Sequence, residues 1–265
     1  MTVVAGVVGW PISHSLSPLL HSAWIEAAGI DGRYEAFGPE DEQAFRQLIE
    51  SGKAGKLTGV NVTAPYKELA LALSNTVSAT ARRAGSANLL AFRKGQVTAD
   101  STDGLGLMEA LGEQAPQLSV TGRLVVILGA GGAARAAVAS LVDHGADVVV
   151  LNRTREKALA LVQEVGGRPG GQDDLRSAAL VVNALSAPPT MDLESLPDNA
   201  VVMDMTYRPL ETPFLSVAKR RGLTGVDGLA MLIGQARPSF KTLFGIAPPV
   251  IDVRALALAH LGETG

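Results

Sequence analysis

The chain has 265 residues, of which 47% are hydrophobic and 18% are charged, and its formal net charge is -3. This composition predicts a globular protein of one or two domains, and nothing in the charge indicates a nucleic-acid-binding surface. Cysteine is absent, which excludes disulfides and thiolate zinc sites and fits a reducing compartment. No apolar run reaches the roughly 20 residues of a membrane helix, and the apolar start lacks the basic region of a signal peptide.

The first hundred residues alternate between segments typical of strands and segments typical of helices. Apolar and β-branched runs predict strands at 3–8, 34–37 and 57–62, and helical spacing predicts helices at 17–28, 40–51, 65–73 and 76–84. Lys94-Gly95 predicts the turn of a hairpin formed by 86–93 and 96–99. Because strands and helices alternate, we expect a mostly parallel sheet.

A second series of strands and helices follows a predicted helix at 103–111 and a candidate linker at 112–122. This series opens with an intensely apolar strand at 124–128. Further strands are expected at 147–151, 180–183, 201–204 and 224–226, and helices at 133–144 and 154–165. The last residues predict helices at 230–244 and 253–261.

A glycine-rich segment connects the strand at 124–128 to the following helix. It consists of Gly129, Ala130, Gly131, Gly132 and Ala133. In this context Gly129 suits a tight turn and Gly131 lets a pyrophosphate approach the backbone, while the small residue after Ala133 permits close packing of helix on strand. The N-terminus of the helix would receive the phosphates. A glycine-rich turn without a ligand is the alternative, which the strand–helix context disfavours.

The end of the next strand indicates which nucleotide binds. An NAD site usually has an acidic residue here, but this chain has Asn152-Arg153-Thr154. Arg153 can grip a 2′-phosphate, Thr154 can donate a hydrogen bond, and Arg155 adds charge. We therefore predict NADP(H). The alternative is that Thr154 only caps the helix and Arg153 is a solvated surface charge.

The first domain carries polar clusters that packing does not require. Ser15 and Ser17 precede a helix and suit a small anion such as a carboxylate, although Ser17 could be an ordinary N-cap. Lys67 stands in the first turn of a helix, where the helix dipole disfavours a cation. A lysine whose charged form is disfavoured is suited to proton transfer. Asp103 lies at a strand-to-helix junction, where it could also be only a first-turn acid.

These motifs, taken together and in this order, resemble the shikimate dehydrogenase (shikimate/quinate dehydrogenase) family over nearly the whole chain. The segments that carry the resemblance are PISHSLSP at 11–18, GVNVTAPYK at 59–67, STDGLG at 101–106, GAGGA at 129–133, NRT at 152–154, DMTYRP at 204–209 and GLAMLIGQA at 228–236.

The resemblance implies an α/β fold with two domains and an active site in the cleft between them. Residues 1–103, completed by C-terminal helices at 230–265, would form an N-terminal α/β substrate domain. Residues 104–229 would form a Rossmann-type NADP-binding domain. Besides the glycine segment and Asn152, Arg153 and Thr154, the resemblance places Ala230 and Met231 near the nicotinamide.

The resemblance also implies the roles of the substrate-site residues. Lys67 and Asp103 would be the catalytic pair, with Lys67 supplying or accepting the proton and Asp103 positioning the reacting oxygen. The remaining residues would hold the substrate, with Ser15, Ser17 and Tyr207 on the carboxylate and Thr63, Asn88 and Gln235 on the ring hydroxyls.

The activity implied is the NADPH-dependent, reversible reduction of 3-dehydroshikimate to shikimate, in the biosynthesis of chorismate and aromatic amino acids. We expect a cytoplasmic enzyme with a small-molecule substrate and no nucleic-acid or membrane partner, for which a homodimer is a possible assembly. The four histidines are scattered without ligand spacing, so no metal is expected.

Some positions depart from the family pattern. Leu89 follows Asn88 where threonine is usual, Ser101 replaces an asparagine, Leu185 replaces a threonine and Ala230 replaces a glycine. These changes affect the expected orientation of the substrate and the seating of the nicotinamide.

The departures leave alternatives open. One is a dehydrogenase for quinate or for an amino-substituted shikimate analogue, which the weak preference of Ser15 and Ser17 for shikimate does not exclude. Another is a catalytically silent NADP-binding regulator, against which the retained pair of Lys67 and Asp103 argues. A folate dehydrogenase is a third alternative, and the serine cluster disfavours it.

Overall fold

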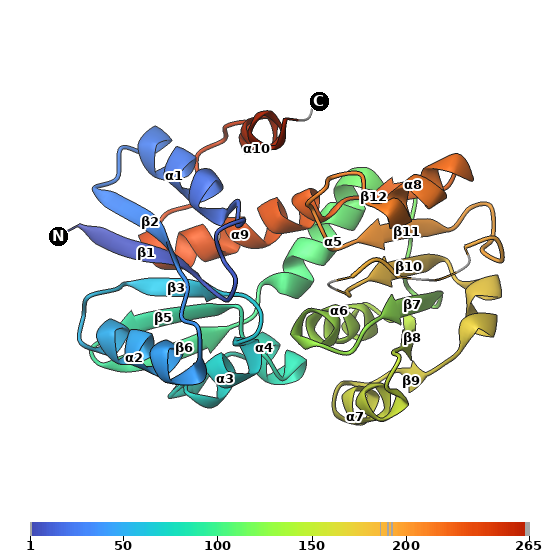
Figure 1. Cartoon of the computed structure of the whole chain (residues 1–265), viewed down its shortest axis with the longest axis horizontal. Coiled ribbons are helices and arrows are strands. Elements are labelled where there is room, and N and C mark those ends of the chain that lie inside the picture. Colours follow the sequence, from blue (N-terminus) through green and yellow to red (C-terminus); the bar gives the residue numbers. More distant parts are fainter. Residues whose placement is uncertain (1, 186, 190, 192, 263–265) are drawn as a thin grey trace. The chain divides into compact units, whose positions relative to one another are not determined.

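The computed structural model describes residues 2–185, 187–189, 191 and 193–262 (Figure 1). The chain divides into two compact units, one formed by Met1–Thr102 with Gln235–Gly265 and the other by Asp103–Gly234. Each unit contains a six-stranded sheet with helices packed on it. The predicted α/β class with two domains is therefore confirmed.

The sheet of the first unit is mixed. Its strands lie in the order β2 (Gly32–Phe37), β1 (Val3–Val8), β3 (Gly59–Val62), β5 (Leu89–Arg93), β6 (Gln96–Asp100) and β4 (Thr76–Val77). β1 runs parallel to β2 and β3, whereas β5 runs antiparallel to β3 and β6. The predicted hairpin is present, and both turn residues, Lys94 and Gly95, have positive φ, as a two-residue turn between twisted strands requires.

The helices of the first unit cover both faces of its sheet. They are α1 (Ser17–Ala27), α2 (Glu42–Lys53), α3 (Lys67–Ala72), α4 (Ala79–Ala84), α10 (Val253–Leu261) and the later part of α9 (Gly228–Phe244). Val60 points into a core shared with α2, α3 and α4. Its neighbour Asn61 points to the opposite face, where it bonds Tyr34 of β2 and Ser239 of α9.

One predicted helix of this unit was wrong at its start. Residues 76–84 were expected to be helical throughout, but Thr76–Val77 pairs with β6 as β4. Ser78 then caps α4, because its hydroxyl oxygen accepts a hydrogen bond from the backbone N–H of Ala81 at 3.1 Å. A serine cap inside the helical pattern marks the boundary.

The sheet of the second unit is parallel throughout. Its strands lie in the order β12 (Thr224–Val226), β11 (Val201–Asp204), β10 (Leu180–Asn183), β7 (Leu124–Leu128), β8 (Asp147–Leu151) and β9 (Arg168–Pro169). This is the strand order of the dinucleotide-binding fold. The order in which the strands are added reverses between β7 and β10, although the two strands are parallel. The predicted Rossmann-type domain is therefore confirmed.

Helices cover this second sheet as well. They are α5 (Asp103–Gln114), α6 (Gly132–Asp143), α7 (Arg155–Val165), the 3-10 helix η1 (Gln172–Ser177), α8 (Pro213–Arg220) and the first part of α9. η1 and α8 share a core with alternate residues of β7, β10 and β11. In the part of the chain that the structure describes, no helix is long and apolar enough to span a bilayer.

Candidate nucleotide and substrate sites

The glycine segment forms the turn between β7 and α6. Gly129 has a φ of +114°, which side-chain-bearing residues rarely adopt. Gly131 is the N-cap residue of α6, and a Cβ added there would meet no atom within 4 Å. The next small residue, Ala134, is fully buried against the sheet. The positive end of the helix dipole and the backbone N–H groups of its first turn favour an anion at this turn.

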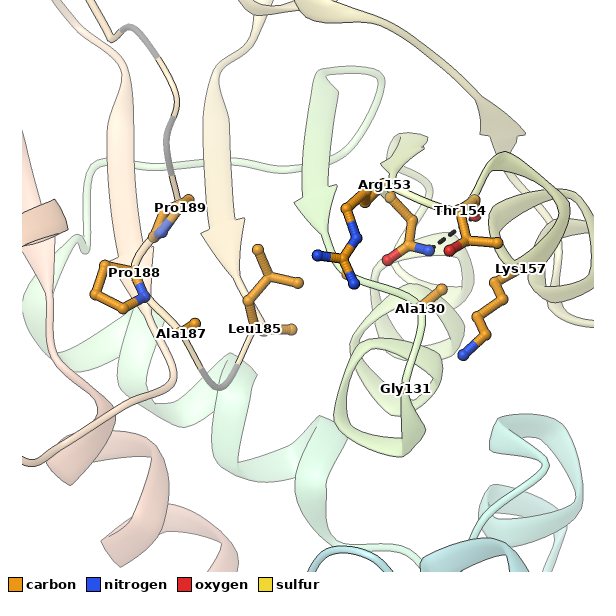
Figure 2. Close-up of a pocket in the computed structure, with 12 residues that line it drawn as sticks. Ala130, Gly131, Arg153, Thr154, Lys157, Leu185, Ala187, Pro188 and Pro189 are labelled. Carbon is orange, nitrogen blue, oxygen red and sulfur yellow. Dashed lines mark hydrogen bonds between the residues drawn. The ribbon is translucent and has the colours of Figure 1, made fainter.

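A pocket of about 590 Å³ opens where β7, β8 and β10 end (Figure 2). It lies at the reversal of strand order, where open α/β sheets bind their ligands, and its volume suits a nucleotide. The residues that line it are Gly129, Ala130, Gly131, Asn152, Arg153, Thr154, Lys157, Ala184, Leu185, Ala187, Pro188 and Pro189.

The predicted phosphate-gripping residues occupy one wall of this pocket. Asn152 donates from its side-chain amide to the carbonyl oxygen of Thr154 at 2.8 Å, which fixes the turn that presents Arg153. Thr154 is the N-cap residue of α7, yet its side chain makes no capping hydrogen bond. A capping hydrogen bond therefore does not explain why a threonine stands at this position. Arg155, which was expected to add charge, is the first residue of α7 and does not line the pocket.

Lys157 also lines the pocket and was not predicted from the sequence. It lies on α7 three residues after Thr154, so both residues are on one face of that helix. Figure 2 shows its side chain reaching into the pocket on the side of Gly131, while Arg153 extends toward Leu185. The spacing from Thr154 was the signal that could have identified it.

A second pocket of about 360 Å³ adjoins the first. The two share Asn152, Arg153, Leu185 and Pro189, and the second is also lined by residues 170–172 after β9. Leu185, one of the departures from the family pattern, therefore contributes an apolar side chain to both pockets. Ser186, the next residue, lies outside the described residues.

The other predicted nucleotide residues occupy two helix starts. Gly132 and Ala133 are the first residues of α6. Ala230 and Met231 are buried in the first turn of α9. That turn is held by Asp227, whose carboxylate accepts from the backbone N–H of Ala230 at 2.9 Å.

In the first unit, the predicted carboxylate-binding serines lie together at the start of α1. The hydroxyl oxygen of Ser15 accepts from the backbone N–H of Ser17 at 3.3 Å. Ser17 is the first residue of α1, and the N-cap position belongs to Leu16. The alternative interpretation of Ser17 as an ordinary N-cap is therefore wrong.

Two further predicted site residues, Thr63 and Lys67, follow β3. A Cβ on Gly9 would lie 2.3 Å from the Thr63 methyl group, so Thr63 packs against the segment that leads to the serines. Lys67 is the first residue of α3, and its carbonyl oxygen accepts from the N–H of Ala87 at 2.9 Å. This bond ties the start of α3 to the residue before Asn88.

Asn88 bonds Gln235 directly, and Thr102 bonds both residues. The Asn88 side chain donates to Thr102 Oγ1 and to Gln235 Oε1, both at 3.0 Å, and it accepts from the backbone N–H of Thr102 at 2.7 Å. Asn88 and Thr102 are buried. These bonds fix both amide groups, which are complementary to hydroxyl groups because each can donate and accept.

The buried side chain of Tyr34 contacts Ser17 and stacks on a buried histidine. Tyr34 donates to Asn61 Oδ1 at 2.8 Å and stacks on the His21 ring at a centroid distance of 4.0 Å. Burial raises the pKa of Tyr34 well above its ordinary value, and a hydrogen bond with Ser17 opposes this shift. Burial also lowers the pKa of His21 to about 3, so this histidine is neutral at physiological pH.

The second unit carries the last two predicted residues. Asp103 is the first residue of α5 and is 5% exposed. Tyr207 lies in the segment between β11 and α8 and is partly exposed. Among the described residues there is no group of histidine and acidic side chains that could hold a metal ion.

Two family models match the chain. The model described as the shikimate dehydrogenase substrate binding domain matches residues 7–90, within the first unit. The model described as shikimate / quinate 5-dehydrogenase matches residues 111–187, within the second unit.

Curated relatives match over almost the whole chain. The shikimate dehydrogenase (NADP(+)) of Caulobacter vibrioides (strain NA1000 / CB15N) is 49% identical over 276 residues, covering 98% of this chain and 96% of its own. That of Gluconobacter oxydans (strain 621H) is 41% identical over 260 residues, covering 93% and 92%.

Solved structures give the same result. The shikimate 5-dehydrogenase from Thermus thermophilus, in complex with NADP(H) and shikimate, is 37% identical with a TM-score of 0.85 and covers 93% of this chain and 95% of its own. The quinate dehydrogenase from Corynebacterium glutamicum, in complex with NAD, is 28% identical with a TM-score of 0.88 and covers 97% and 99%. The resemblance is confirmed at this identity and coverage, and this chain belongs to the shikimate dehydrogenase family.

Proposed function

We propose that this chain catalyses the NADPH-dependent, reversible reduction of 3-dehydroshikimate to shikimate. The observation that carries the proposal is the nucleotide pocket, whose wall has Arg153, Thr154 and Lys157 where an NAD site would have an acid. Two relatives named as NADP-dependent shikimate dehydrogenases, at 49% and 41% identity, support the same activity.

The residues of the second unit fit NADP(H). The turn at Gly129 and Gly131 suits the pyrophosphate, and two cations with the Thr154 hydroxyl suit a 2′-phosphate. When bound, this cofactor supplies the hydride of the reaction. The protein's part is to hold it and to exclude other chemistry.

Lys67 and Asp103 are the proposed catalytic pair. During reduction the ketone oxygen gains negative charge and needs a proton, which the Lys67 ammonium supplies; in the reverse direction the neutral amine accepts it. Asp103 accepts a hydrogen bond from the reacting hydroxyl and so holds it in position.

The substrate is held by neutral hydrogen-bonding groups. Ser15, Ser17 and Tyr207 bind the carboxylate, and Thr63, Asn88 and Gln235 bind the ring hydroxyls. The support for the second group is the bond between Asn88 and Gln235, since an ordered pair of amides can discriminate hydroxyl positions.

The domain roles, the location and the assembly complete the proposal. Residues 1–103 with 230–265 form the substrate domain, and residues 104–229 form the NADP-binding domain. The enzyme acts in the cytoplasm, in the biosynthesis of chorismate and aromatic amino acids. A homodimer is the assembly to be tested, by light scattering at several protein concentrations.

A substrate panel tests the proposal. The purified chain is assayed for oxidation of shikimate and of quinate, each with NADP⁺ and with NAD⁺. Turnover with shikimate and NADP⁺ above the other pairs is the expected result. Preference for quinate with NAD⁺ would favour the activity named for the Corynebacterium glutamicum relative. NADPH binding without turnover on either substrate would favour a silent regulator.

A further inference from the structure

The buried carboxylate at the end of β11 is not one of the predicted site residues. Asp204 is only 2% exposed. Its Oδ1 accepts from Asn183 Nδ2 at 3.0 Å and from the backbone N–H of Thr206 at 2.9 Å, and its Oδ2 accepts from Thr212 Oγ1 at 2.7 Å. Because a buried carboxylate is costly without hydrogen-bond donors, these bonds fix the positions of all four residues.

One branch of these bonds reaches the nucleotide pocket. Asn183 is 1% exposed, and its Oδ1 accepts from the backbone N–H of Leu185 at 3.1 Å. The amide is therefore held at both ends, by Asp204 on one side and by Leu185 on the other. Leu185 lines both pockets and packs on the phosphate-binding turn, where a Cβ on Gly129 would lie 3.2 Å from its side chain.

The second branch holds the segment that carries Tyr207. The N–H of Met205 donates to the carbonyl oxygen of Asn183 at 3.0 Å, and the N–H of Thr206 donates to Asp204. Gly228 allows this close path, since a Cβ there would lie 2.4 Å from the Met205 carbonyl oxygen. Tyr207 follows directly, so its backbone starts from a fixed point.

The far end of the same segment is bonded to the same carboxylate. Thr212 is the N-cap residue of α8, and its hydroxyl oxygen accepts from the N–H of Leu215 at 3.2 Å. That cap needs only the threonine. Burying a carboxylate costs more free energy than orienting one hydroxyl requires. The same carboxylate is well suited to fix two segments at once.

We propose that Asp204 is a positioning residue for both ligands: through Asn183 it holds Leu185 against the nucleotide, and through Thr206 it holds the segment that presents Tyr207 to the substrate carboxylate. This inference rests on the proposed function. It predicts that the two branches have separable effects on the two Michaelis constants.

Three variants and one control test the inference. Asp204→Ala removes both branches, Asn183→Ala removes the nucleotide branch, and Asp204→Asn keeps the shape and the accepting oxygen. Leu223→Ala is the control, because it truncates the core beside α8 without touching these bonds. The measurements are KM for NADPH and for 3-dehydroshikimate, kcat, the melting temperature, and the Kd of NADPH from its fluorescence.

Each lost hydrogen bond sets the expected size. Asp204→Ala raises both Michaelis constants by about three- to tenfold, as the loss of one buried hydrogen bond at each ligand implies. Asn183→Ala raises KM and Kd for NADPH by a similar factor and leaves KM for 3-dehydroshikimate unchanged. Asp204→Asn restores both constants to near wild type. Leu223→Ala lowers the melting temperature and changes neither constant.

The opposite pattern overturns the inference. If Asp204→Ala behaves like Leu223→Ala, with a lower melting temperature and unchanged constants, Asp204 is structural only. If Asp204→Ala does not fold, Asn183→Ala decides: an unchanged Kd for NADPH refutes the branch to Leu185. A wild type that binds NADPH but does not reduce 3-dehydroshikimate refutes the proposed function instead, and the NADPH titration of Asn183→Ala still decides the inference.

Discussion

Replacing Arg153 with alanine tests which phosphate the nucleotide pocket holds. Arg153 lines both pockets at the end of β8, and its backbone is fixed by the bond from Asn152 to Thr154. A hydrogen bond to a charged group contributes about 1.5–3 kcal/mol, so we expect KM for NADPH to rise about ten- to 150-fold. NADH lacks the 2′-phosphate and should lose far less.

The neighbouring arginine gives a matched control. Arg155→Ala removes the same charge two residues away, but Arg155 does not line either pocket. Because solvent and salt screen an exposed charge at a distance, we expect only a small change in KM for NADPH. Steady-state rates of 3-dehydroshikimate reduction with NADPH and with NADH measure both variants. Equal losses with the two cofactors in Arg153→Ala, or equal losses in the two variants, would refute the assignment.

Three further substitutions test the proton transfer, the apolar wall of the nucleotide pocket and the buried histidine. Lys67→Ala should lower kcat by about 10²–10⁴-fold with little change in shikimate affinity; a rise in KM alone would contradict the proton-transfer role. Leu185→Thr should raise KM for NADPH by about fourfold for each buried methylene group lost, and an unchanged KM would remove Leu185 from the nucleotide site. His21 has a folded pKa of about 3, below its unfolded value, so its neutral form stabilises the fold above pH 6.5 and this stability is lost as the pH falls toward 3. His21→Phe should flatten that pH dependence in urea unfolding; an unchanged slope would show that His21 does not cause it.

The nucleotide turn could be predicted because its signals are local. A buried strand, three glycines and a helix follow one another within 20 residues of sequence, from Leu124 to Asp143. The fixed geometry of that connection makes the spacing informative. The positively charged wall of the nucleotide pocket was only partly predicted, because Lys157 lies one helical turn beyond the Asn152-Arg153-Thr154 motif.

The buried polar networks could not be predicted, because they join distant segments. Asn88 and Gln235 are 147 residues apart in the chain, and Asn61 and Ser239 are 178 apart. No local pattern says which amide meets which hydroxyl. The bonds of Asp204 to Asn183 and Thr212 likewise depend on the alignment of β10, β11 and α8.

The errors in secondary structure come from short elements. β4 has two residues and is defined by its pairing with β6, so its sequence alone favours the helix that follows. β9, η1 and α8 were not predicted for similar reasons, since they have two, six and eight residues. Tertiary contacts decide such segments more than propensity does.

The proposed reaction can be measured by following 3-dehydroshikimate and NADPH together in one mixture with the wild-type chain. Mass spectrometry measures the shikimate formed, and absorbance measures the NADPH consumed. We expect the two amounts to be equal and NADH to support a much slower reaction. Consumption of neither compound by a chain that binds NADPH, or equal rates with NADH, would contradict the proposed function.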